Sequence, residues 1–178
     1  MRLPADATLI VIDAAARVEA PDAPVPGSPA AKAAALIAAW RHEGLPLVRA
    51  ASLESGEAQD AQDAAPREGE RPGEHAVAHS ALSAFDASGL ESLLEELGAT
   101  TLVLCGAAAK VAASAREAAA LGYQVYVVAD ACVGADDGAV ATLSPDCAAL
   151  ADAAQILAAA GLAKFRERWK EQRSRGGG

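Results

Sequence analysis

The stretch Thr101-Leu102-Val103-Leu104-Cys105-Gly106 decides the fold of this chain. It is an unbroken apolar run, typical of a strand that is buried on both faces of a parallel sheet. The Ala-rich segment 107–121 has the composition of a helix and ends at Gly122, and a second apolar run follows at 123–128. A strand, a helix and a strand in this order predict a βαβ unit with two parallel strands.

The rest of the chain repeats this alternation, and its predicted elements are strands over 8–13, 47–50 and 76–78 and helices over 30–42, 90–97 (with Ser88 as the N-cap) and 146–160. We therefore predict an α/β fold, a three-layer α/β/α sandwich with a mostly parallel, Rossmann-like sheet. Ligands of such sheets bind at the carboxyl ends of the strands.

The length of 178 residues indicates one domain, which we place at residues 1–163. Residues 164–178 form a separate basic tail, in which Phe165 and Trp169 have the spacing of a short amphipathic helix. The segment 52–74 is acidic and polar without periodicity, and it predicts a long loop that could act as a lid.

The composition excludes several classes of partner. A net charge of −9 opposes binding to nucleic acid, which depends on clustered cations. The chain has neither an apolar run long enough to span a membrane nor a secretory leader, so we expect a cytoplasmic protein without a membrane partner. The three cysteines form no CxxC pair, and we expect reduced thiols, no metal and no cofactor, with a small molecule as the possible ligand.

Two positions at the predicted functional edge carry the site hypothesis. Asp13 ends the first strand and could act as a general acid or base, although a carboxylate there also commonly caps a turn. Gly106 ends the strand of the βαβ unit, and Ala108, Ala109 and Lys110 follow it at the start of a helix. Free backbone N–H groups and one ammonium predict an anion or oxyanion site there, although Lys110 on position alone is more readily explained as a solvated helix residue.

The remaining chemistry-bearing side chains give weaker signals. None of the three histidines has the spacing of a metal ligand pair, and His79, just after the predicted lid, is the one placed to act at the site. The thiols of Cys105, Cys132 and Cys147 are more readily explained as inert packing than as nucleophiles.

Several motifs together resemble the isochorismatase-like (cysteine hydrolase) family over most of residues 7–160. The motifs are Leu9-Ile10-Val11-Ile12-Asp13, Ser83-Ala84-Phe85 with Gly89-Leu90, Leu102-Val103-Leu104-Cys105-Gly106, Ser114-Ala115-Arg116-Glu117-Ala118, Leu121-Gly122-Tyr123-Gln124-Val125 and Val127-Val128-Ala129-Asp130-Ala131-Cys132. The resemblance implies a six-stranded parallel sheet flanked by helices and, because the family is usually oligomeric, a homo-oligomer.

The resemblance also implies a catalytic trio of Asp, Lys and a nucleophilic Cys, in which the Asp deprotonates the thiol and backbone amides hold the oxyanion. Asp13 matches the family's Asp, while the family's Lys position is His79 here. Counting forward from Gly106 places the nucleophile at Ala112, and counting backward from Ser114 places it at Lys110. Neither residue is a thiol, so the nucleophile of the family is lost.

Two further departures concern relatives with a metal. The family's string of one Asp and two His would fall within 49–54 and is missing, and Ala14 and Ala15 stand where a Gln would follow the catalytic Asp. A nicotinamidase is therefore disfavoured. Some isochorismate hydrolases of the family lack the Cys and cleave a vinyl ether without a covalent intermediate, although they keep the Lys.

Three functions remain open, and they differ in whether the chain is an enzyme. The first is a non-catalytic binding or scaffolding pseudoenzyme. The second is a non-covalent hydrolase or lyase, with Asp13 as acid or base, His79 as a second proton-transfer group and Lys110 holding an anionic substrate. The third is a thiol amidohydrolase with a displaced cysteine such as Cys105.

Overall fold

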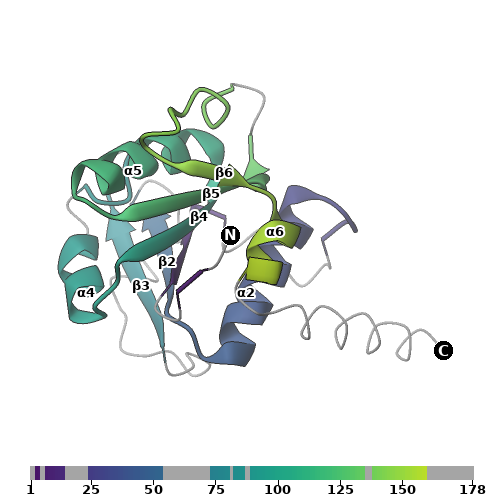
Figure 1. The fold of residues 1–178 in the computed structure, drawn as a ribbon, viewed down its shortest axis with the longest axis horizontal. Coiled ribbons are helices and arrows are strands. Elements are labelled where there is room, and N and C mark those ends of the chain that lie inside the picture. Colours follow the sequence, from purple (N-terminus) through teal and green to yellow (C-terminus); the bar gives the residue numbers. More distant parts are fainter. Residues whose placement is uncertain are drawn as a thin grey trace.

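The protein is a six-stranded, all-parallel sheet with helices on both faces, as a computed structural model shows (Figure 1). The structure describes residues 3–4, 7–14, 24–53, 73–80, 82–86, 89–134 and 138–159. The predicted tail and most of the predicted lid, at 54–72, lie outside the described residues. The three-layer α/β/α architecture predicted from the sequence is confirmed.

The strands have the spatial order β3-β2-β1-β4-β5-β6. Their bounds are β1 Thr8–Ile12, β2 Leu47–Ser52, β3 Glu74–His79, β4 Thr101–Ala107, β5 Gln124–Val133 and β6 Ala149–Ala151. The chain therefore builds one half of the sheet outward from β1, and then crosses to the other side of β1 to begin β4. The carboxyl ends of β1 and β4 flank this switch point, which is the usual ligand site of an open parallel sheet.

Two apolar layers hold the helices to the sheet. The helices are α2 Pro29–Glu43, α4 Leu90–Glu96, α5 Ala108–Ala120 and α6 Ala153–Ala159. One core cluster joins α2 and α6 to one face, around the fully buried Trp40. The other joins α4 and α5 to the opposite face, and small alanines such as Ala112 and Ala115 let α5 pack closely on β4.

One predicted element in the C-terminal part of the chain was wrong. The sequence predicts a single helix over 146–160, whereas the chain first forms the edge strand β6 and begins α6 only at Ala153. Asp130 on β5 accepts a hydrogen bond from the Ala153 backbone N at 2.8 Å and so fixes the helix start. Local helix propensity in this Ala-rich segment is overridden by pairing with β5.

Smaller corrections concern the ends of elements. Strand β3 spans Glu74–His79 rather than 76–78, β2 extends to Ser52, and β5 extends to Val133. The residue that caps α4 is Gly89, with φ of 67°, and not Ser88. Ser88 itself lies outside the described residues. These strands extend because parallel pairing with their neighbours continues beyond the apolar runs that mark them in the sequence.

Candidate functional site

The carboxylate of Asp13 is the centre of the candidate site. Asp13 directly follows β1 and has φ of 48°, a conformation that few non-glycine residues adopt. Its backbone N donates to the Ala50 carbonyl of β2 at 2.9 Å, so the turn continues the sheet pairing. The local conformation aims the side chain across the carboxyl ends of the neighbouring strands.

Groups from three elements surround this carboxylate. The Ser52 backbone N at the end of β2 donates to Oδ1 at 2.5 Å. Nε2 of His79, the last residue of β3, lies 3.5 Å from the same oxygen. Lys110, the third residue of α5, donates from Nζ to Oδ2. The structure thus brings together the three side chains Asp13, His79 and Lys110 that the sequence singled out.

Burial differs sharply within this trio. The side chain of His79 is 0% exposed and that of Asp13 10%, whereas that of Lys110 is 26% exposed. The Asp13 carboxylate is therefore largely shielded from solvent, and Lys110 is the member of the trio that solvent reaches most. Removing water from such a pair strengthens its attraction relative to a surface pair.

Gly106 makes this geometry possible, and its role is a residue requirement that the sequence analysis did not identify. It has φ of 124°, and a Cβ atom there would lie 2.1 Å from the Ile12 carbonyl oxygen. Gly106 pairs with Ile12, the residue before Asp13, beside an irregularity in the pairing of β4 with β5. The missing side chain lets the start of α5 approach Asp13.

The predicted oxyanion residues lie where the sequence placed them, at the beginning of a helix. Ala108, Ala109 and Lys110 form the first turn of α5, where backbone N–H groups have no acceptor within the helix. Ala112 lies one turn further in and is 1% exposed, with its side chain in the core cluster between α5 and the sheet. Of the two positions that counting gave for the nucleophile, only Lys110 reaches Asp13.

A hydrogen bond ties two of the quoted motifs together. The Ala84 backbone N donates to Ser114 Oγ of α5 at 2.9 Å, and both residues are buried. This bond fixes the segment after β3, which contains Phe85, against the helix that carries Lys110. The spacing of Ser52 and Ser114 in the sequence gave no signal of these contacts, because both depend on strand register and helix packing.

The two buried thiols, Cys105 and Cys132, are poorly suited to nucleophilic attack at this site. Cys105 belongs to the core cluster on the face of α2 and α6, and burial, followed by the neighbouring Cys132, raises its pKa far above the ordinary value. Cys132 is buried and donates from Sγ to the Val128 carbonyl at 3.3 Å. Burial chiefly, opposed by the Gly106 backbone and helped by Asp130, raises the pKa of Cys132 to about 12. At neutral pH only about one in 10⁵ such thiols is ionised.

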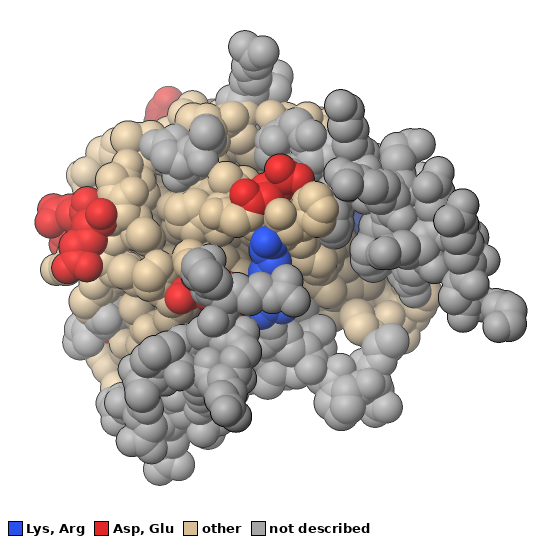
Figure 2. Space-filling view, turned by 90° about the horizontal axis from the view of Figure 1, so that it is seen from below, with Lys and Arg blue, Asp and Glu red and all other residues tan. Residues whose placement is uncertain are grey.

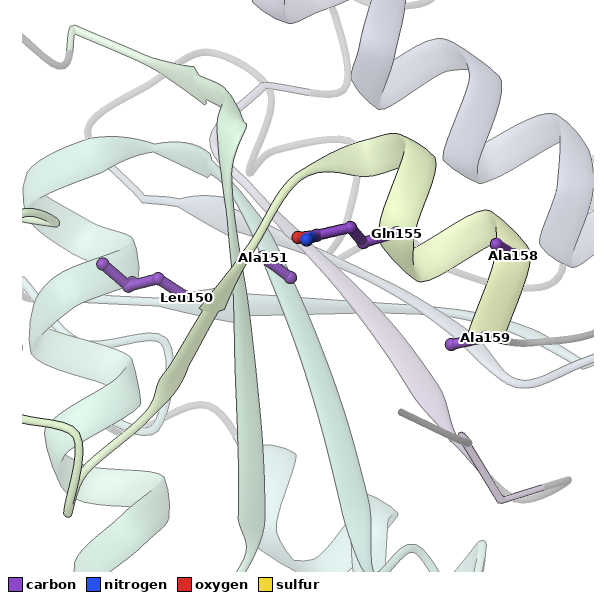
Figure 3. Close-up of a pocket in the computed structure, with 5 residues that line it drawn as sticks. All are labelled: Leu150, Ala151, Gln155, Ala158 and Ala159. Carbon is purple, nitrogen blue, oxygen red and sulfur yellow. The ribbon is translucent and has the colours of Figure 1, made fainter.

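Other parts of the described structure offer little chemistry. Within the described ranges, no group of three or more His, Cys, Asp or Glu residues could hold a metal ion. No described helix has the length and apolarity to cross a membrane. A hollow at the β6 edge is lined by Leu150, Ala151, Gln155, Ala158 and Ala159, in which Gln155 is the one polar side chain (Figure 3). It lies at the edge strand, with β4 and β5 between it and β1.

Charged side chains outside the site are grouped unevenly. Figure 2 shows acidic side chains gathered at one edge of the face it views, and basic ones confined to a small central area beside other acids. The exposed glutamates Glu91, Glu95 and Glu96 all belong to α4. The absence of nucleic-acid binding stays a prediction.

Comparisons with known proteins agree with the motifs quoted above. The family model described as the isochorismatase domain matches residues 7–155. An isochorismatase family protein from Burkholderia thailandensis is 28% identical, with 89% of this chain and 97% of that chain covered and a TM-score of 0.67.

Two more distant structures share the fold. N-carbamoylsarcosine amidase from Thermoplasma acidophilum is 20% identical, covers 86% of this chain and 97% of its own, and has a TM-score of 0.60. A nicotinamidase from Staphylococcus aureus is 19% identical, with 83% and 100% covered and a TM-score of 0.61. No curated protein sequence matches the chain.

Proposed function

Since this chain belongs to the isochorismatase family, we propose that it is a member without thiol chemistry, whose site binds a small molecule and does not hydrolyse it. The contact between Lys110 and Asp13 carries this proposal. The ammonium of Lys110 contacts the Asp13 carboxylate, which in a thiol hydrolase would deprotonate the thiol. With Oδ2 on the ammonium and Oδ1 on the Ser52 backbone N, the proton that this carboxylate is placed to accept is that of Lys110 and not that of a thiol.

The location of the cysteines supports the same conclusion. A thiol hydrolase needs a sulfur that is ionised, or becomes so, beside its base. Cys105 packs on the opposite face from α5, and Cys132 is buried with a pKa of about 12. A displaced cysteine nucleophile, the third function left open by the sequence, therefore has the least support.

A second candidate is favoured by the convergence of the trio. Asp13, His79 and Lys110 meet at one strand edge, as a non-covalent hydrolase or lyase would require. In that reaction Asp13 moves a proton, His79 serves as a second proton-transfer group, and Lys110 holds an anionic substrate. The full set of donors on Asp13 makes this the second choice.

The test is an activity and adduct assay on the purified chain. Ammonia release from nicotinamide and from N-carbamoylsarcosine, and consumption of isochorismate, should not exceed the rates of the Lys110→Met variant. The intact mass of the protein, measured after the reaction is stopped without hydroxylamine, should show no acyl group on any cysteine. Turnover that disappears in Asp13→Asn without a thiol adduct would favour the second candidate, and an acylated cysteine would overturn both.

A pair of cysteine variants tests which position took the place of the nucleophile. Lys110→Cys should present a thiol beside Asp13 that iodoacetamide alkylates in the folded protein. Ala112→Cys is the matched control on the same helix, and its thiol should stay unmodified until the protein unfolds, since Ala112 is 1% exposed. Equal alkylation of the two variants would contradict the assignment of Lys110 to the site.

A further inference from the structure

Lys110 is an amine held next to a proton acceptor at the edge of the sheet. Its Nζ donates to Asp13 Oδ2, and its side chain is 26% exposed, whereas His79 is fully buried. Of the three side chains, that of Lys110 is therefore the most exposed to solvent. Among side chains, a lysine amine is the usual nucleophile towards aldehyde and ketone carbon.

The neighbours of Lys110 fit this chemistry. An ammonium must lose a proton before its nitrogen can attack, and the Asp13 carboxylate is in direct contact to accept it. Lys110 also lies in the first turn of α5, where the helix dipole disfavours a positive charge and so opposes the effect of Asp13. The Ser52 backbone N donates to Oδ1 and so holds the carboxylate in place, with His79 Nε2 3.5 Å from the same oxygen, which leaves Oδ2 to take the proton.

We propose that Lys110 forms an imine with a small carbonyl compound, an aldehyde or a 2-oxo acid. This ligand class rests on the proposed function, in which the site binds a small molecule and does not hydrolyse an amide. The nitrogen attacks the carbonyl carbon, and a C=N bond replaces the C=O bond. Of the three ammonium protons, two leave with the carbonyl oxygen as water and one stays on the imine nitrogen, so no oxidant or reductant is needed. The protonated imine keeps the positive charge that Asp13 pairs with.

The chain provides a matched internal control. Lys32 of α2 forms an ion pair with Asp130 of β5 at 2.9 Å, and its side chain is 37% exposed. Lys32 is thus more accessible than Lys110 and is also paired with an aspartate. The aspartates differ in burial, since Asp130 is 29% exposed, whereas Asp13 is 10% exposed and has the buried His79 at 3.5 Å. Exposure alone would favour reaction at Lys32, and proton transfer in the site would favour Lys110.

The experiment is reductive trapping of the full chain with pyruvate and cyanoborohydride, followed by peptide mapping by mass spectrometry. The expected result is one reduced adduct on Lys110, formed at least about tenfold faster than any adduct on Lys32. The variant Lys110→Arg keeps a cation beside Asp13 and should lose the rapid adduct. Asp13→Asn should slow labelling of Lys110, with circular dichroism to check that the variant is folded. Labelling of Lys32 at the same rate, or faster labelling in Asp13→Asn, would overturn the proposal.

Failure here is distinguishable from failure of the proposed function. If the protein forms neither a Lys110 adduct nor an acyl-cysteine, the proposal of a carbonyl ligand fails, and the proposal of a binding site without thiol chemistry is unaffected. An acyl-cysteine removes the proposed function whatever Lys110 does.

Discussion

Two lysine–aspartate pairs join helices to strands in this protein, and they differ in what surrounds them. In the inner pair, Lys110 of α5 contacts Asp13 after β1, whose side chain is 10% exposed. In the outer pair, Lys32 of α2 contacts Asp130 of β5, whose side chain is 29% exposed. The inner aspartate also has a fully buried histidine at 3.5 Å, while the outer one caps α6.

The difference separates a structural ion pair from a site. The outer pair links α2 and the start of α6 to β5, and each partner remains hydrated. The inner pair lies at the switch point between β1 and β4, where helix dipole, backbone donors and burial act on the same two groups. The same two residue types thus form a structural ion pair at one place and a candidate site at the other, because the fold sets their exposure to solvent and the donors around them.

The largest expected effect comes from the backbone under the inner pair. Gly106→Ala should lower the free energy of unfolding by about 4 kcal/mol or more, because the new Cβ would overlap the Ile12 carbonyl at 2.1 Å. Gly122→Ala is the control, since Gly122 has φ of 94° with no atom within 4 Å of the added Cβ. That variant should lose only about 1–2 kcal/mol of backbone strain. Urea unfolding measures both, and equal losses would show that Gly106 is not specially constrained.

Removing the lysine of each pair gives the next largest contrast. Lys110→Met leaves a mostly buried carboxylate without its cation and should cost about 1–3 kcal/mol, less than for a fully buried pair because Lys110 is partly exposed. Lys32→Met should cost about 0.2–1 kcal/mol, as exposed pairs do. Both variants keep a long apolar stem. If the Lys32 variant proves the less stable of the two by urea unfolding, the distinction between inner and outer pair fails.

The last contrast concerns the thiol near the outer pair and is measured over the single unit from pH 9 to pH 10, where the change is at most about 1.4 kcal/mol. Burial raises the pKa of Cys132 to about 12, so the folded state retains a proton that the unfolded chain releases above its ordinary value near 9. The contribution is complete below pH 9 and is lost as the pH rises towards 12, at no more than about 1.4 kcal/mol per pH unit. Cys132→Ala should flatten the decline in unfolding free energy between pH 9 and 10. An unchanged slope in that variant would mean that Cys132 does not titrate in this way.

Sequence patterns predicted the two central strands and their crossover helix because those segments carry their own evidence. The apolar runs ending at Asp13 and Gly106 leave no doubt about burial, and Gly122 marks a helix end. Edge strand β6 was missed because it is only three residues long and lies in an Ala-rich segment whose local propensity is helical. Its existence depends on hydrogen bonds to β5.

By itself, the sequence determined the α/β class, the strand ends that carry the site, and the candidate residues Asp13, His79 and Lys110. Only the tertiary structure decided that Lys110, and not Ala112, faces Asp13, and that Ser52 donates to the carboxylate. Apolar periodicity is a local property and is written in neighbouring residues. Contacts between side chains on three strands and a helix depend on strand register and on the close approach at Gly106, which only the folded chain fixes.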